Sequence, residues 1–170
     1  HIDVVKFLLD KGAKFNIKGN RGYTPMEWAA MRGRKEVIDI FISKGAKPNL
    51  VDAAGCGHIS LMERLLKEGA DLNQKNKAGN TPLHMATLRS QKEFVLLLIE
   101  KGAKLNIKNK DSETSLDLAI EREKVEIEKI LRSKGAKNAP VPEPDSSMIV
   151  PNIYRIYFPR NNTTACCLKR

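Results

Sequence analysis

Residues 69–84 of this chain read Gly-Ala-Asp-Leu-Asn-Gln-Lys-Asn-Lys-Ala-Gly-Asn-Thr-Pro-Leu-His, and this stretch decides the fold. Gly69 follows an apolar run of helical character, where a helix end needs a residue that tolerates left-handed backbone angles. Gly79 supplies a tight turn, and Thr81 can cap a helix whose first position is Pro82, which has no amide hydrogen. The stretch therefore predicts a helix end, a short turn and the start of the next helix.

The same marks recur along the chain. Gly-Ala pairs begin at residues 12, 45, 69, 102 and 135, so the successive intervals are 33, 24, 33 and 33 residues. Each unit is a turn followed by two short helices, and it is too small to bury its own apolar face. Such units become stable by stacking on their neighbours, so the sequence predicts an all-α solenoid.

This period, with Gly-x-Thr-Pro-Leu-His at 79–84 and Gly-Ala-Asp-Leu-Asn at 69–73, resembles the ankyrin repeat. The resemblance covers residues 1–138 and implies stacked helix-turn-helix units with short hairpin fingers. The expected units are a truncated first repeat, a full repeat, a repeat without its finger, a further full repeat and a C-terminal cap, at residues 1–15, 16–48, 49–72, 73–105 and 106–138. Residues 139–170 are expected to form a Pro-rich linker and an extended, disordered tail, with a docking motif or strand at 154–158 as the alternative.

The two terminal units differ from the others. Residues 2–9 have the pattern of a second helix without its first, so we expect a chain truncated in mid-repeat. Such a chain exposes an apolar stacking face at Val5, Leu8 and Leu9, and is otherwise expected to be a monomer. The last helix, at 123–133, carries charges around most of its circumference and is expected to cap the solenoid.

The interval of 24 residues is a further departure. We expect both helices of this unit at 50–54 and 59–67, and we assign the nine missing residues to the finger, which the preceding unit has at 16–24. The helical stack then continues while the row of fingers has a gap. A partner segment that enters this gap would meet Arg32 and Arg89, whose guanidinium groups suit carboxylates. The alternative is a tolerated loop change without a role.

Composition narrows the class of function. The 170 residues are 41% hydrophobic but only 5% aromatic, which predicts one domain with an aliphatic core. A net charge of +10 suits nucleic acid, an anionic membrane or an acidic protein, but residues 1–138 contain no run of five like charges. Three cysteines, two of them adjacent, are not a disulfide framework and indicate a reducing, cytoplasmic location. No apolar stretch has the roughly 18 residues of a membrane span.

No set of residues indicates catalysis. The sequence has no nucleophile–base pair, metal-ligand set or phosphate loop, so we expect no enzyme, cofactor, metal or small-molecule substrate. In proteins that the chain resembles, the His of Thr-Pro-Leu-His is structural, and His84 is interpreted in the same way. Trp28 occupies an apolar first-helix position and is assigned to the core, with partial exposure in a groove as the alternative. Cys56, in an expected turn at 55–57, is interpreted as an ordinary thiol.

The resemblance also implies one recognition face, made of finger tips and exposed residues of the first helices. Carried over position by position, it gives as candidate partner-binding residues Asn20, Arg21, Tyr23, Met31, Arg32, Lys77, Ala78, Asn80, Leu88, Arg89, Lys110, Asp111, Glu113, Glu121 and Arg122. In the pairs Met31-Arg32 and Leu88-Arg89 an apolar side chain stands beside an arginine, a combination typical of binding hot spots. The alternative at each position is a solvated surface residue.

These observations predict a non-catalytic scaffold or adaptor that binds a protein, expected to carry an acidic segment, through its concave finger and inner-helix surface. One alternative is a regulatory or targeting arm of a larger enzyme. A nucleic-acid or anionic-membrane binder has less support, because stripes of basic residues with stacking aromatics are missing.

Overall fold

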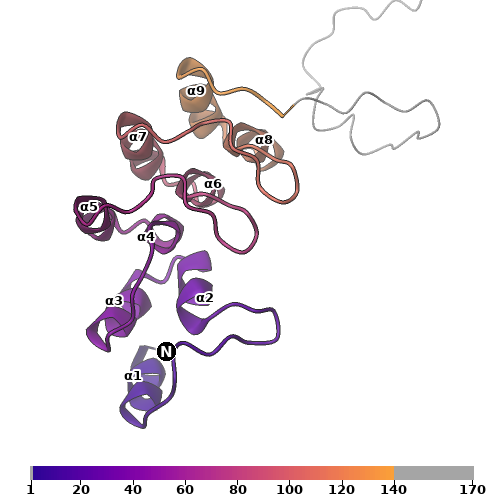
Figure 1. The fold of residues 1–170 in the computed structure, drawn as a ribbon. Helices are drawn as coiled ribbons and strands as arrows, with labels where there is room; N and C mark the ends of the chain where they lie inside the picture. The colour runs from indigo at the N-terminus through magenta and orange to yellow at the C-terminus, as the bar shows by residue number, and fades with distance from the viewer. Residues whose placement is uncertain (1, 140–170) are drawn as a thin grey trace, which may run out of the picture. The chain divides into compact units, whose positions relative to one another are not determined.

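The computed structural model describes residues 2–139, and this part of the chain contains nine helices and no strand. The helices follow one another as a stack of pairs (Figure 1). Their bounds are α1 (Ile2–Asp10), α2 (Pro25–Met31), α3 (Lys35–Ser43), α4 (Leu50–Cys56), α5 (Ile59–Lys67), α6 (Pro82–Leu88), α7 (Lys92–Glu100), α8 (Ser115–Glu121) and α9 (Val125–Ser133). Apart from Ala139, the expected linker, tail and docking segment lie outside the described residues.

The helices form two rows. One row holds α2, α4, α6 and α8, and the other holds α1, α3, α5, α7 and α9 (Figure 1). Each helix of the first row packs against the next helix of that row and against the helix that follows it in the chain. Contacts between neighbouring units thus dominate, as in other stacked repeats. The all-α repeat solenoid that the sequence predicts is confirmed.

The core of the stack is aliphatic, as the low aromatic content predicts. Phe41 and Phe94 are the buried aromatic side chains of residues 2–139. The other large apolar side chains that are fully buried are Ile38, Leu50, Met62, Leu83, Val95, Leu98, Leu116 and Leu131. Every residue of α4 is buried, whereas α1 has no buried residue. Burial is therefore greatest in the middle of the stack and least at its N-terminal helix.

Each helix of the first row begins with a capping box. The N-cap side chain accepts a hydrogen bond from the backbone N–H three residues later, and the side chain at that later position accepts one from the N-cap N–H. The four pairs are Thr24 with Glu27, Asn49 with Asp52, Thr81 with His84, and Thr114 with Asp117. Glutamate, aspartate and histidine side chains therefore all serve as the acceptor for the N-cap N–H.

His84 makes hydrogen bonds within the turn region, as its structural interpretation requires. Its Nδ1 accepts from the Thr81 N–H at 3.2 Å, and its Nε2 lies 3.1 Å from the carbonyl oxygen of Glu113, to which it donates. Burial lowers the pKa of His84, which favours the neutral ring that this pattern needs. Asp117 performs the same capping role and also accepts from the Ala139 N–H at 3.0 Å, so packing of the solenoid extends to that residue.

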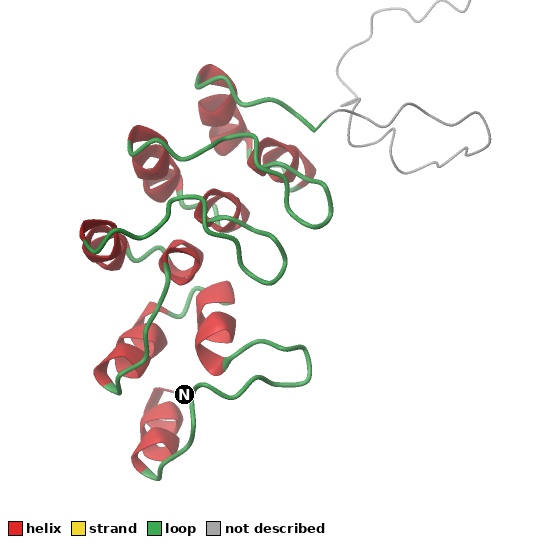
Figure 2. Ribbon diagram, in the orientation of Figure 1, coloured by secondary structure: helices red, strands yellow, loops and turns green. Residues whose placement is uncertain are grey.

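Three fingers project from the loops that precede α2, α6 and α8 (Figure 2). We call residues 13–24 the first finger, residues 70–81 the second finger and residues 103–114 the third finger. Only residues 44–49 connect α3 to α4. The place between the first and second fingers therefore has no finger of its own, and we call it the gap.

The first helix of the unit without a finger is longer than expected. α4 continues through Gly55 and Cys56, which the sequence assigned to a turn, and the turn lies at Gly57 and His58. Gly55 is a residue of close helix packing, because a Cβ atom on it would lie 2.8 Å from the carbonyl oxygen of Ala30 in α2. A glycine that permits such an approach looks the same in a sequence as one that forms a turn.

The nine missing residues come from two places, which corrects their assignment to the finger alone. Gly12 lies twelve positions before the N-cap residue Thr24, whereas Gly45 lies four positions before the N-cap residue Asn49. The finger is therefore eight residues shorter. The ninth residue is lost between the N-cap of α4 and the left-handed residue of the following turn.

α1 exposes an apolar surface that differs in part from the expected one. Val4, Phe7 and Leu8 are between 49% and 59% exposed. Val5 and Leu9, which were expected on the same face, are half-buried and pack against the core. Both sets of residues follow the helical spacing i, i+3 and i+4, and the packing of α1 against α3 decides which side of the helix is covered.

Replacing Glu123 by glycine should stabilise the folded chain. It occupies the left-handed position of the turn before α9, with φ 54°, where the α2 and α4 units have Gly33 and Gly57. A side chain in this conformation costs about 1–2 kcal/mol, and the greater unfolded-state entropy of glycine offsets part of the gain. We expect Glu123→Gly to raise the free energy of unfolding by about 0.5–1 kcal/mol in urea titrations.

The matched control is Lys129→Gly, at an exposed position inside α9, where glycine should lower the stability by about 1 kcal/mol. A loss of stability in both variants would contradict the strain at Glu123.

Candidate protein-binding surface

A groove of about 460 Å³ runs along the finger side of the stack, from the end of α2 to the end of α8. We call it the groove and define it by its lining residues, Tyr23, Met31, Asn76, Ala78, Asn80, Met85, Leu88, Arg89, Arg122 and Lys124. Its walls are apolar thioether and aliphatic side chains together with finger residues. Three lining residues are cationic and none is acidic.

Seven of the predicted recognition-face residues line this groove. They are Tyr23, Met31, Ala78, Asn80, Leu88, Arg89 and Arg122, and they come from three different units. Both predicted apolar–arginine pairs contribute to it, since Met31, Leu88 and Arg89 belong to the lining and Arg32 stands next to Met31. Binding of a partner by these residues stays a prediction. Asn76, Met85 and Lys124 also line the groove and are not among the residues predicted from the sequence. Met85 occupies a mostly buried core position, which hides its contribution to the groove.

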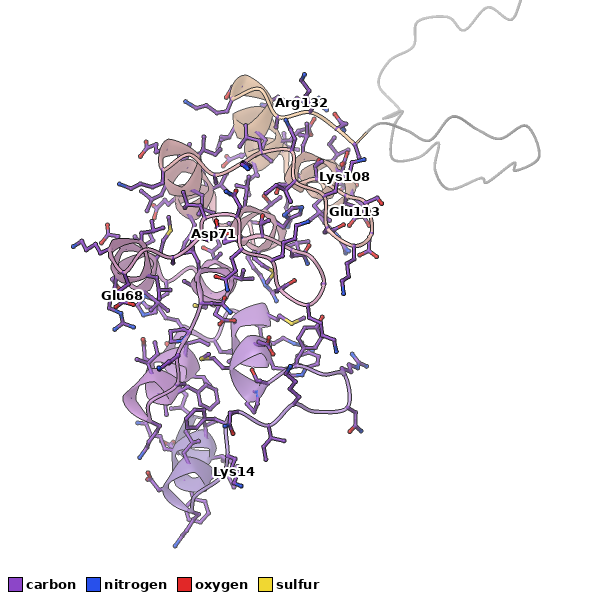
Figure 3. All side chains as sticks on the ribbon, in the orientation of Figure 1. Lys14, Glu68, Asp71, Lys108, Glu113 and Arg132 are labelled. Atoms are coloured by element: carbon purple, nitrogen blue, oxygen red, sulfur yellow. The ribbon has the colours of Figure 1, made fainter. Side chains whose placement is uncertain are left out.

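The other predicted residues lie outside the groove. Asn20, Arg21, Lys77, Lys110 and Asp111 are exposed near the finger tips, and Arg32 and Glu121 are exposed at the ends of their helices. Glu113, labelled in Figure 3 with Lys108, is half-buried at the base of the third finger. Its carboxylate accepts from Asn109 Nδ2 at 3.0 Å, and burial raises its pKa. These contacts give Glu113 a structural role in holding its finger.

Arginines occupy one equivalent position in three units. The residue just before the left-handed turn residue is Arg32, Cys56, Arg89 or Arg122, in chain order. Burial, and then the charge of Arg32, lower the pKa of Arg89, so the two guanidinium groups repel each other. Neither takes part in an ion pair within residues 2–139. An anion bound near both groups would relieve this repulsion.

Cys56 interrupts the row of arginines. Its side chain is buried, and its Sγ lies 3.5 Å from the carbonyl oxygen of Ala53. Burial raises the pKa of the Cys56 thiol to about 11. The protonated, inaccessible thiol has little nucleophilic reactivity, which agrees with its interpretation as an ordinary cysteine.

Trp28 forms an aromatic and cationic cluster beside the groove. Its ring meets the ring of Tyr23 edge-on at 5.8 Å, and the guanidinium carbons of Arg21 and Arg32 each lie 5.9 Å from its centroid. Trp28 is half-buried, so the alternative of partial exposure describes it better than the core assignment. The spacing of four residues between Trp28 and Arg32 on one helix is the signal that points to this cluster.

The excess of positive charge lies mostly away from the groove. The residues that flank the Gly-Ala pairs form two rows, Lys11, Lys44, Glu68, Lys101 and Lys134, and Lys14, Lys47, Asp71, Lys104 and Lys137. In both rows the unit without a finger carries an acidic residue, and Glu68 and Asp71 lie apart from Lys14 (Figure 3). These side chains are exposed, and the acidic unit divides each row. They therefore form no continuous basic stripe of the kind that follows a nucleic-acid backbone.

Residues 2–139 contain neither a membrane-spanning helix nor a cluster of metal-binding side chains. None of these helices is long and apolar enough to cross a membrane. No group of three or more His, Cys, Asp or Glu side chains in this part of the chain is arranged to hold a metal ion.

Comparison with known proteins gives one family and several partial relatives. A family model described as ankyrin repeats (3 copies) matches residues 1–52 and 50–140. Human Ankyrin repeat domain-containing protein 63 is 31% identical over 98 residues, which cover 50% of this chain and 26% of the relative. Human Ankyrin repeat and KH domain-containing protein 1 is 36% identical over 91 residues, covering 47% of this chain and 4% of the relative.

A third relative carries the name of an enzyme. Palmitoyltransferase AKR1 of Lachancea kluyveri is 26% identical over 145 residues, which cover 58% of this chain and 20% of the relative. The chain therefore spans about a quarter or less of the length of each of these three proteins.

Proposed function

Since the chain belongs to the ankyrin-repeat family, we propose that it is a non-catalytic binding module that holds an acidic segment of a partner protein in the groove and against Arg32 beside it. The observation that carries this proposal is the pair Arg32 and Arg89, two neighbouring guanidinium groups without a carboxylate partner in residues 2–139. Guanidinium groups bind carboxylates in a fork geometry, so a glutamate or aspartate of the partner would neutralise both.

The surroundings of these arginines suit a binding hot spot. Met31, Met85 and Leu88 provide apolar surface next to the charges, and Trp28 and Tyr23 provide aromatic surface. Aromatic residues, methionine and arginine are the types enriched at the centres of protein interfaces. The helices that carry them are packed in the solenoid, so binding loses little conformational entropy.

The proposal is tested with the double variant Arg32→Glu and Arg89→Glu. Peptides selected from a random display library on the immobilised 170-residue chain should be rich in Asp and Glu. The double variant should bind a selected peptide at least tenfold more weakly, which corresponds to about 1.4 kcal/mol, because attraction becomes repulsion. Titration calorimetry measures the affinity, and binding to the unaltered chain should weaken as salt is added.

The control for this test is Lys101→Glu with Lys134→Glu, which changes the net charge equally on exposed residues outside the groove. It should alter the affinity less than twofold. If the two double variants weaken binding equally, net charge and not the groove would account for the effect. Unchanged binding by the arginine variant, with the helical circular dichroism intact, would place the interface elsewhere.

A second candidate function is a regulatory or targeting arm of a larger enzyme. The match to part of Palmitoyltransferase AKR1, of which it covers 20%, favours this candidate. It is compatible with the first, because an arm of this kind acts by binding. Three cysteines, two of them adjacent in the sequence, are not a disulfide framework and support a reducing, cytoplasmic location for either.

A further inference from the structure

Neighbouring fingers are joined by hydrogen bonds where both are present. The Lys110 N–H of the third finger donates to the Ala78 carbonyl oxygen of the second at 3.1 Å. The Asn109 side chain donates to Asn80 Oδ1 at 3.1 Å, and Lys75 Nζ donates to the Lys108 carbonyl oxygen at 2.9 Å. The Lys104 N–H also donates to Asn73 Oδ1 at 2.8 Å. One backbone bond and three bonds that involve a side chain therefore link the fingers.

The gap leaves the equivalent backbone groups without this link. Lys77 N–H stands where Lys110 N–H stands one unit later, and it has no hydrogen-bond acceptor within residues 2–139. The Arg21 carbonyl oxygen of the first finger corresponds to that of Ala78. It accepts from the side chain of Lys77, whose Nζ lies 3.1 Å away and 5.7 Å from the centre of the Tyr23 ring. A flexible lysine thus crosses the place of a finger and occupies an acceptor that a backbone N–H holds elsewhere.

A pocket of about 240 Å³ lies in the gap. Ala30, Met31, Val51 and Met85 give it apolar walls, and the capping carboxylates Glu27 and Asp52 border it. The exposed residues among its lining include three lysines, Lys18, Lys75 and Lys77. The lysines outnumber the carboxylates, and both carboxylates already accept hydrogen bonds from the N-cap residues of their helices. The accessible part of the pocket is therefore cationic.

We propose that the gap is a docking site for an acidic turn of a partner protein, which takes the position of the missing finger. A backbone carbonyl of the turn accepts from Lys77 N–H, and a backbone N–H replaces Lys77 Nζ on the Arg21 carbonyl. The released Lys77 ammonium, with Lys75, binds a carboxylate of the turn. The inference rests on the proposed protein-binding function and assigns to it a second subsite and a shape of ligand.

The gap and the groove are continuous. Tyr23, Met31, Asn76 and Met85 line both of them. One partner segment can therefore place a turn in the gap and an extended acidic stretch along the groove. The second finger shows the kind of turn that fits. The turn at its tip begins at Asn76 and ends at Gly79, whose N–H donates to the Asn76 carbonyl oxygen at 2.9 Å.

The test uses a backbone-cyclised synthetic peptide that copies residues 73–81, with Lys75→Glu and Lys77→Glu introduced into the copy. The unaltered, basic copy is the matched control peptide. Titration calorimetry with the full 170-residue chain should detect binding of the acidic peptide, with at least tenfold weaker binding of the basic copy. An acidic peptide that shows no binding at roughly 1 mM would overturn the proposal.

A chain with a restored finger should lose this binding. Inserting a copy of residues 16–23 between Pro48 and Asn49 supplies the eight residues that the unit lacks, and the inserted finger should occupy the gap. We expect the acidic peptide to bind this chain at least tenfold more weakly. Unchanged binding to the restored chain would overturn the gap as the docking site.

A charge exchange provides a test that needs no insertion. Lys77→Glu in the chain should lower the affinity for the acidic peptide at least fivefold and raise the affinity for the basic copy, since the attraction is reversed. Weakening without any gain by the basic copy would contradict a contact at Lys77. Arg89→Glu with Arg122→Glu, in the groove but outside the pocket of the gap, should change binding of the cyclic peptide less than twofold. If the cyclic peptide does not bind while library peptides still bind the groove, only the gap proposal fails. If the cyclic peptide binds while the arginine variants leave library-peptide binding unchanged, only the groove proposal fails.

Discussion

Gly55→Val is expected to lower the free energy of unfolding by about 3 kcal/mol, because α2 and α4 leave no room for a side chain at this position. A Cβ atom on Gly55 would lie 2.8 Å from the carbonyl oxygen and 3.0 Å from the carbonyl carbon of Ala30. Both are backbone atoms, so relief requires that α2 or α4 move as a unit. α6 restricts such a movement, since Met85 Cε lies 3.3 Å from the same point.

Urea unfolding followed by circular dichroism measures this effect, and the melting temperature should fall by roughly 10 °C. The control is Gly45→Ala, in the loop before α4. Gly45 has φ 88°, but a Cβ atom on it would have no heavy atom within 4 Å, so this change should cost only the backbone strain of about 1 kcal/mol. Equal losses in the two variants would show that the contact between α2 and α4 does not limit side-chain size at Gly55.

Asp52→Asn is expected to stabilise the chain at pH 7 by about 2–3 kcal/mol. Asp52 is 4% exposed, and burial raises its pKa from 3.8 to about 6 against the opposing hydrogen bond from Asn49, with a further increase from the charge of Glu27. The folded chain therefore holds a proton that the unfolded chain releases between these two values, and its stability falls as the pH rises from about 4 through about 6. An asparagine at this position keeps an oxygen that can accept from the Asn49 N–H but does not ionise.

The pH dependence identifies the cause of the effect. The difference in unfolding free energy between the variant and the natural chain should be large at pH 7 and should nearly vanish at about pH 3, below both pKa values, where Asp52 is largely protonated in both states. Urea midpoints at the two pH values give this difference, and the contributions of other carboxyl groups cancel. A difference that does not depend on pH would mean that the pKa of Asp52 is the same in the folded and the unfolded chain.

The sequence predicts the fold because the marks of the repeat are local. Gly69, Gly79, Thr81 and Pro82 each act through their own backbone angles or through a cap three residues away. Prediction was weaker where a residue acts across units. Gly55 was assigned to a turn because its role depends on the carbonyl of Ala30 in the preceding unit, which no local pattern reveals.

The residues of the candidate site could also be predicted only where the signal is local. Repeat position alone indicates which face a residue occupies, and this was enough to bring Met31, Leu88 and Arg89 to one groove. It was not enough for Trp28, which is half-buried and whose ring contacts Tyr23 and Arg21 of the first finger. It also could not predict the contact of Lys77 with Arg21, which are 56 residues apart and meet only because the finger between them is missing.

The uneven burial along the stack has a consequence for the order in which the chain folds. Contacts in a solenoid link near neighbours, so folding can begin at any unit and spread from it, and it begins where a unit gains the most. α4, with all of its residues buried between α2 and α6, is such a place, whereas α1 has no buried residue to gain from. The chain should therefore assemble outward from α2, α4 and α6, and α1 should be the last helix to join and the first to open.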